Sequence, residues 1–381
     1  MLAVEAAVAG AAAHLGLVDP VAAAAVVTAC DPKAFAAAAL ADGMLHHATP
    51  VIALVERLRS LVPDDAEPAV HYGLTSQDVV DTAAMLVTRA ALEPILDRAW
   101  AVTDLLVALA TRYRDAPQAG RTLLQQAAPT TFGAACAARL VAVTEATVAL
   151  VEQRDARLAV QLGGPVATLA TAGTAGPALV ADVARRLGLA VPVLPWHTGR
   201  GRIGSLASAL GVLAAELAAV AQDVVLLSSS EIGEVAVARA GGSSAMAHKR
   251  NPAPAVLAVA SAHRTPGLVA TLLAGMPQEL QRAAGRWQAE VPTLVELLRL
   301  TGATAGHVRD ALDGLVVDQA RMRAAASALA AATGGDPSDP DVGGAAALVD
   351  RALAFHRSLR PPGRPRSGTT SSPDADHGDH R

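Results

Sequence analysis

The sequence has few aromatic residues, few cysteines and no excess of positive charge. Phe, Trp and Tyr together make up 2% of its 381 residues, whereas 52% of the residues are hydrophobic. The core must therefore consist mainly of Ala, Val and Leu, and small side chains at that density favour closely packed helices. Cys30 and Cys136 are the only cysteines; they indicate reduced, buried thiols in a cytoplasmic protein rather than a disulfide framework or a metal site. A net charge of −4 argues against a nucleic-acid binder.

A secretory leader and an uninterrupted membrane-spanning run are also missing. The first residues lack a basic segment and have the pattern of an amphipathic helix, so we expect no signal peptide. The most apolar stretch, residues 206–227, is interrupted by Glu216, Gln222 and Asp223. We therefore predict that it is a central helix of a buried bundle rather than a membrane span.

Helical patterns fill most of the chain, and strand signals are almost absent. Helical patterns extend over about 77–114, 131–162, 203–232 and 252–273, and a kink is expected at Pro94 in the first of them. The longest helix is expected over 203–232. The patterns predict an all-α fold, a bundle of long helices. We divide it into an N-terminal helical domain over 1–80, a central bundle over 81–325, a shortened C-terminal helical domain over 326–357 and a disordered tail over 358–381.

The most informative segment runs from Gly241 to Pro252 and reads GGSSAMAHKRNP. Asn251 can cap a helix and Pro252 suits its first position, so backbone N–H groups would point toward the serines. A helix N-terminus next to Lys249 favours an anion and would also stabilise a serine alkoxide. A solvated basic loop is the simpler interpretation of such a composition taken alone.

Two further polar breaks carry hydroxyl groups in front of expected helices. Residues 71–78 read HYGLTSQD, in which Thr75 and Asp78 have the spacing of a capping box. Residues 121–133 read RTLLQQAAPTTFG and precede the next helix. Each break alone is most simply a helix cap, but three of them predict a site for a substrate with several carboxylates, because helix N-termini bind oxyanions. The cationic side chains expected to join them are His71, Arg121, His248 and Lys249.

The segment 241–252 resembles the signature loop of the fumarase/aspartase superfamily, whose usual form is Gly-Ser-Ser-x-Met-Pro-x-Lys-x-Asn-Pro. Residues 71–83 resemble the first shared region of adenylosuccinate lyases and 3-carboxy-cis,cis-muconate cycloisomerases. The middle segment separates these groups, because the lyases carry a histidine directly after the threonine of this motif. Here Leu123 follows Thr122, so the segment resembles the cycloisomerase version.

The missing histidine has a chemical consequence. A lyase that expels an amine or hydroxide needs an acid to protonate the poor leaving group. In lactonisation the substrate's own carboxylate attacks an alkene carbon, and only one proton has to move. The resemblance therefore implies a cycloisomerase that closes 3-carboxy-cis,cis-muconate to its γ-lactone, in the protocatechuate branch of the β-ketoadipate pathway.

The resemblance also implies a role for each matching residue. Ser243 would be the general acid/base, and Lys249 and Asn251 would hold a carboxylate and stabilise an aci-carboxylate intermediate. The other carboxylates would be bound by Thr75, Ser76 and Thr122, with His71 and Gln126 as weaker candidates. Members of this family look like homotetramers with active sites shared between subunits, and neither a cofactor nor a metal is implied.

Two alternatives stay open. One is a lyase of the adenylosuccinate or argininosuccinate type, which a histidine at position 123 would have favoured. The other is a catalytically silent helical scaffold, against which the joint retention of the site residues argues. Three departures from the family pattern bear on activity: Ala247 replaces the loop proline and is expected to loosen the loop, the chain begins inside an early helix of the first domain, and the C-terminal domain is shortened.

Overall fold

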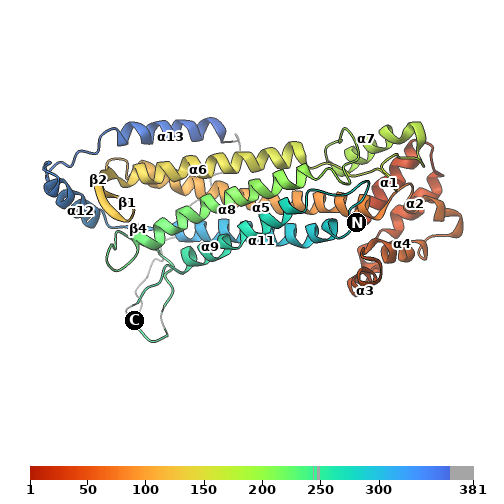
Figure 1. The fold of residues 1–381 in the computed structure, drawn as a ribbon, viewed down its shortest axis with the longest axis horizontal. Helices are drawn as coiled ribbons and strands as arrows, with labels where there is room; N and C mark the ends of the chain where they lie inside the picture. The colour runs from red at the N-terminus through yellow and green to blue at the C-terminus, as the bar shows by residue number, and fades with distance from the viewer. Residues whose placement is uncertain (243, 247–248, 361–381) are drawn as a thin grey trace, which may run out of the picture. The chain divides into compact units, whose positions relative to one another are not determined.

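The computed structural model of the protein describes residues 1–242, 244–246 and 249–360. Helices dominate this part of the chain, which confirms the predicted all-α class, and two small two-stranded sheets accompany them (Figure 1). The chain forms two compact units. The first comprises residues 1–97, 145–222 and 254–308, and the second comprises residues 98–144, 223–253 and 309 onward.

Several short helices of the first unit begin at or next to a proline. Asp19 caps α2 by accepting hydrogen bonds from the backbone N–H groups of Val21 and Ala22 at 2.8 and 3.0 Å, and Pro20 occupies the first turn. Helix α1 packs against both α2 and α7. These short helices are α1 (Leu2–His14), α2 (Pro20–Ala29), α3 (Ala37–His47), α4 (Val51–Arg59) and α7 (Gly176–Leu187).

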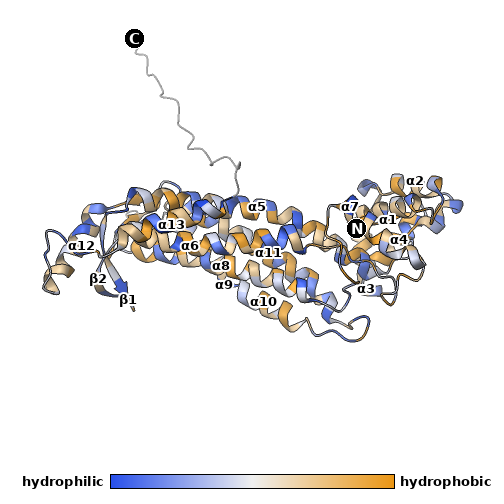
Figure 2. Cartoon of the chain, turned by 90° about the horizontal axis from the view of Figure 1, so that it is seen from above, coloured by the Kyte–Doolittle hydropathy of each residue, from blue (hydrophilic) through white to orange (hydrophobic). Residues whose placement is uncertain are grey.

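Four long helices contribute residues to both units. They are α5 (Ser76–Arg112), α6 (Phe132–Glu152), α8 (Gly201–Leu227) and α11 (Arg286–Leu312). The longest in the described part of the chain is α5, with 37 residues, whereas the pattern had favoured the helix near 203–232. Leucine, valine and alanine fill their buried positions, as the scarcity of aromatic residues predicts, and Figure 2 shows how these apolar positions alternate with polar ones.

Two expected helices are shorter than predicted. Helix α6 ends at Glu152 and a π-helical turn, Gln153–Arg157, follows it, so it does not extend to residue 162. The helix expected over 252–273 is divided into α9 (Ala253–His263) and α10 (Thr265–Ala274). The division falls at Arg264, and Pro266 lies in the first turn of α10, where a backbone N–H has no partner within the helix and the proline is tolerated.

The polar break at residues 116–131 is a β-hairpin, which the sequence analysis did not predict. Strands β1 (Pro117–Thr122) and β2 (Gln125–Thr131) pair antiparallel around a two-residue turn. Leu123 and Leu124 form this turn with φ values of 50° and 64°, a left-handed geometry that Asn-Gly usually adopts. The prediction failed because neither leucine is a turn-forming residue. Thr131, rather than Thr122, caps the following helix, since its Oγ1 accepts a hydrogen bond from Ala134 N at 3.1 Å.

The second unit is built around this hairpin. Helix α12 (Gln319–Ala332) packs against both of its strands, and a second small sheet pairs β3 (Val235–Ala236) with β4 (Val316–Val317). Its hydrophobic core contains an edge-to-face pair, Tyr113 and Phe132, whose ring centroids lie 5.5 Å apart.

Three helical stretches, 132–157, 201–227 and 253–274, are long and apolar enough to cross a membrane by length and composition alone. In α8 the side chains of Leu206, Leu210, Leu213 and Leu217 are nevertheless buried inside the protein, each at most 1% exposed. One face of α8 is therefore packed within the bundle.

Helix α13 (Ala345–Leu359) is held in the second unit by buried polar contacts. His356 Nδ1 lies 3.0 Å from Thr144 Oγ1, and the ring of His356 stands edge-on to Trp100. Arg360 lies over the Trp100 ring and donates a hydrogen bond to Asp104 at 2.8 Å. Burial, followed by the nearby arginine charges, lowers the pKa of His356 from 6.5 to about 4.

We therefore expect acid to destabilise the packing of α13. As the pH falls below about 6.5 the unfolded chain binds a proton at His356 that the folded chain takes up only near pH 4, so stability that is fully present above pH 6.5 is lost across this interval. The loss should amount to roughly 2–3 kcal/mol. Urea denaturation at several pH values measures it. His356→Gln should abolish this part of the pH dependence, and His263→Gln, at an exposed position of α9, should retain it; an unchanged slope in His356→Gln would contradict the assignment.

Candidate active site

Thr75 and Ser76 lie at the N-terminus of α5, as predicted. Asp78 accepts a hydrogen bond from the backbone N–H of Thr75 at 3.0 Å, which is one half of the predicted capping box. The N–H groups in the first turn of a helix have no partners within the helix, so they are donors for an anion. This end of α5 therefore presents N–H donors and two hydroxyl groups, those of Thr75 and Ser76.

The Asp78 carboxylate is fully buried and accepts hydrogen bonds from four donors. Besides Thr75, these are the backbone N–H of Gly164 at 2.9 Å, His197 Nε2 at 2.7 Å and Gln161 Nε2 at 3.3 Å. A buried carboxylate with this many donors is well satisfied. Asp78 thus ties the first turn of α5 to the segments around residues 161–164 and 197.

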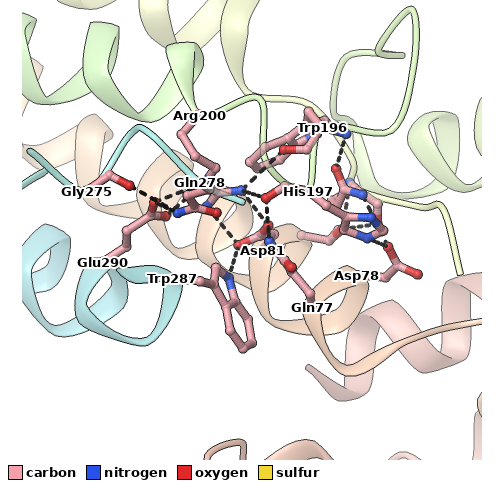
Figure 3. A network of polar contacts seen from close by, with 12 residues as sticks. Gln77, Asp78, Asp81, Trp196, His197, Arg200, Gly275, Gln278, Trp287 and Glu290 are labelled. Atoms are coloured by element: carbon pink, nitrogen blue, oxygen red, sulfur yellow. Dashed lines mark hydrogen bonds and ion pairs between the residues drawn. The ribbon is translucent and has the colours of Figure 1, made fainter. Parts of the chain in front are cut away.

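A second buried carboxylate one turn further along α5 belongs to an ionic network (Figure 3). Asp81 accepts hydrogen bonds from Arg200 Nη1 at 2.7 Å and from Trp287 Nε1 at 2.9 Å, and Arg200 Nε lies 3.0 Å from Glu290 Oε1. Burial opposes the charge of Arg200, but the two carboxylates outweigh it and the pKa of the guanidinium is raised. Burial raises the pKa of Glu290. Gln278 completes the group by donating to Glu290 Oε1 at 2.8 Å.

His71 is paired with a protein carboxylate. Its Nδ1 lies 2.7 Å from Glu5 Oε1 and its backbone N–H donates to Glu5 Oε2 at 3.1 Å. Glu5 is 1% exposed, and His71 has a φ of 57°. The residue that was expected to attract a substrate carboxylate is therefore already engaged by a carboxylate of the protein.

Arg121 is likewise engaged. Its guanidinium donates to both carboxylate oxygens of Glu234, at 2.6 and 3.2 Å, and Gln118 Nε2 donates to the same carboxylate at 2.8 Å. The backbone oxygen of Glu234 accepts a hydrogen bond from Asp318 N at 2.9 Å. Glu234 therefore joins the hairpin, the segment before the signature loop and the start of α12.

The hairpin borders a polar cavity of about 710 Å³ in the second unit. Gln126 contributes to its wall, whereas Thr122 lies exposed at the end of β1, beside the turn. The other polar side chains that line it are Arg121, Gln125, Glu231, Glu234 and Arg321.

The signature loop is closed by a pair of backbone hydrogen bonds. Gly241 N donates to Asn251 O and Asn251 N donates to Gly241 O, both at 2.8 Å. The side chain of Asn251 donates to Gly242 O at 3.1 Å, so this amide closes the loop. Lys249 is exposed. Ser243, Ala247 and His248 lie outside the described residues.

The predicted site residues fall into two groups. His71, Thr75 and Ser76 belong to the first unit, and Thr122, Gln126, Lys249 and Asn251 belong to the second. Within the described parts of the chain, no group of three or more His, Cys, Asp or Glu side chains could hold a metal ion.

The chain was compared with known protein families, curated proteins and solved structures. The lyase family profile matches residues 2–267. The chain belongs to the lyase family. It is 42% identical to a 3-carboxy-cis,cis-muconate cycloisomerase of Pseudomonas aeruginosa over 329 residues, which cover 85% of this chain and 72% of that protein. It is also 42% identical to a nitrosuccinate lyase of Streptomyces davaonensis, over 85% of this chain and 71% of that protein.

The fold agrees with this assignment. The crystal structure of the 3-carboxy-cis,cis-muconate lactonizing enzyme from Pseudomonas putida superposes with a TM-score of 0.87 and 33% identity, covering 94% of each chain. The predicted family membership is therefore confirmed.

Sequence reasoning missed the buried residues that hold the site of this lyase-family protein together. Neither the pairing of Glu234 with Arg121 nor that of His197 with Asp78 was predicted. The available signal was the presence of ionisable residues within otherwise apolar segments, because such residues are rarely buried unless they are paired. Their partners are 113 to 119 positions away, so the sequence did not identify them.

We expect Arg200 to be essential for the stability of the first unit. Arg200→Met leaves Asp81 and Glu290 buried without their counter-charge, which should lower the free energy of unfolding by about 3–5 kcal/mol. Arg299→Met is the matched control, because Arg299 pairs with Glu296 on the surface and exposed pairs contribute little. Urea denaturation compares the two, and similar small losses in both variants would show that the network is dispensable.

Proposed function

We propose that this protein is a cytoplasmic 3-carboxy-cis,cis-muconate cycloisomerase. The observation that carries the proposal is its 42% identity with such an enzyme over 85% of the chain. The hairpin turn supports it, because an exposed leucine, Leu123, occupies the place where amine lyases carry a histidine. A reaction without a basic leaving group does not need an acid at this position.

The proposed reaction is an isomerisation with one proton transfer. One carboxylate oxygen of the substrate attacks an alkene carbon and forms the C–O bond of the lactone. The electron pair of the alkene moves toward a neighbouring carboxylate and gives an aci-carboxylate. Ser243 then donates its proton to the carbon next to that carboxylate and regains a proton from solvent, so the trianionic substrate takes up one proton overall.

Hydrogen-bond donors, together with Lys249, would stabilise the negative charge of the substrate. Lys249 and Asn251 would stabilise the aci-carboxylate, whose charge develops only during the reaction. The N-terminus of α5, with Thr75 and Ser76, would bind a second carboxylate through N–H and hydroxyl groups. Thr122 and Gln126 at the hairpin would bind the third. Because His71 and Arg121 are paired with Glu5 and Glu234, we assign them to holding the site rather than to binding substrate.

The site is proposed to be assembled in a homotetramer. Only 22% of the most apolar window of α9 and α10 is buried within one chain. Two adjoining apolar cavities of about 310 Å³ each lie along α5 and α11 in the first unit and share Pro50, Val80 and Val291. Apolar surfaces of this kind are typical of protein–protein interfaces, and further copies of the chain would cover them and bring the two groups of site residues together.

A second candidate is elimination from nitrosuccinate, which the equal identity to a nitrosuccinate lyase favours. A nitro group that leaves as nitrite is a good leaving group and needs no acid. The absence of a histidine at position 123 therefore agrees with both reactions and does not distinguish them.

A direct comparison of the two substrates tests the proposal. Purified protein should consume the conjugated diene of 3-carboxy-cis,cis-muconate, which is followed by the loss of its ultraviolet absorbance. Nitrosuccinate should release little nitrite in a parallel colorimetric assay. Nitrite release with no loss of the diene would reject the cycloisomerase and establish the second candidate.

Ser243 is expected to be essential for the preferred reaction. Ser243→Ala should lower kcat by about 10²–10⁴-fold, the usual contribution of general acid–base catalysis, while the fold and the oligomeric state stay intact. Ser244→Ala is the matched control in the same loop and should keep most of the activity. Full activity in Ser243→Ala would assign the proton transfer to another group.

A further inference from the structure

The N-terminus of α5 is fixed by a histidine that is distant in sequence. His197 Nε2 lies 2.7 Å from Asp78 Oδ1, while Asp78 Oδ2 accepts the backbone N–H groups of Thr75 and Gly164 at 3.0 and 2.9 Å. The two oxygens of one carboxylate thus connect His197 to the turn that carries Thr75. Asp78 is 0% exposed and His197 is 2% exposed, so water does not replace either partner.

His197 is itself held firmly in place. Its backbone oxygen accepts a hydrogen bond from Gln77 Nε2 at 2.8 Å, so the same turn of α5 contacts His197 through both its main chain and its side chain (Figure 3). Gly163 lies against the imidazole ring: a Cβ at this position would stand 2.8 Å from His197 Cε1. The backbone is therefore shaped to admit the ring at this place.

We infer that His197 is a positioning residue that sets the carboxylate-binding N-terminus of α5 by acting through Asp78. The inference rests on the proposed function, in which Thr75 and Ser76 bind a substrate carboxylate. His197 donates from Nε2, which orients the Asp78 carboxylate. The oriented carboxylate then holds Thr75 N–H, so that the hydroxyl groups and free N–H groups of this turn keep one fixed arrangement toward the substrate.

Loss of the contact between His197 and Asp78 should raise KM rather than lower kcat. We assign to α5 the carboxylate that neither attacks the alkene nor becomes the aci-carboxylate. Its charge does not change during the reaction, so its contacts are made equally in the ground state and the transition state. Loss of such uniform binding raises KM and leaves kcat nearly unchanged. A residue that served only the stability of the fold would lower the amount of active protein without changing KM.

The test uses two substitutions of His197 and one control in the full-length protein. His197→Leu removes the donor and should raise KM about tenfold, equivalent to about 1.4 kcal/mol, with kcat within about threefold of the native value. His197→Gln keeps an N–H donor near the position of Nε2 and should restore KM to within about threefold. Leu92→Ala, at a fully buried position of the same helix, should lower Tm and leave KM unchanged.

Amide hydrogen exchange gives a second readout that does not require turnover. In His197→Leu the amides of Thr75 and Gly164 should exchange at least about tenfold faster, whereas His197→Gln and Leu92→Ala should leave them close to the native rate. Absence of turnover in the native protein together with this exchange pattern would reject the proposed substrate and retain the positioning role. Unchanged exchange in His197→Leu, or an unchanged KM in an active His197→Leu protein, would overturn the inference.

Discussion

The burial of two aspartates on the first turns of α5 is the constraint on which the first unit depends. Asp78 and Asp81 stand three residues apart and are almost completely removed from water, so each needs compensating donors. His197 supplies a donor to the first aspartate, and Arg200 neutralises the second. Both partners lie within residues 197–200. These contacts therefore fix the position of that segment relative to the start of α5.

The same principle decides which cations are free to meet a substrate. Histidine and arginine side chains near the polar breaks suggested several free positive charges. Two of these side chains are paired within the protein, His71 with Glu5 and Arg121 with Glu234. In both pairs the carboxylate is 1% exposed, so the basic side chain satisfies a buried carboxylate. In the proposed function, carboxylates are therefore bound by neutral donors, the N-terminus of α5 and Lys249.

Much of the fold could be predicted because its signals are local. The prolines that follow Asp19, Asp31 and Thr49 mark helix starts, and apolar periodicity identified the long helices. The hairpin could not be predicted, since its turn consists of Leu123 and Leu124 in a left-handed conformation that leucine rarely adopts. Cross-strand pairing stabilises this turn, and that pairing is a property of the folded chain. The extent of α5 was predicted within two residues at each end, and Pro94 lies within this one continuous helix.

The sequence by itself determined the all-helical class, the signature loop with Ser243 and Lys249, and the family to which the chain belongs. These features depend on residues that are neighbours along the chain, where spacing and local propensity carry the information. Only the tertiary structure decided which charges are paired and which residues hold the site, as Glu234 and His197 illustrate. A buried carboxylate is stabilised by whichever donor the fold brings within hydrogen-bonding distance, and that choice depends on packing between segments more than a hundred residues apart.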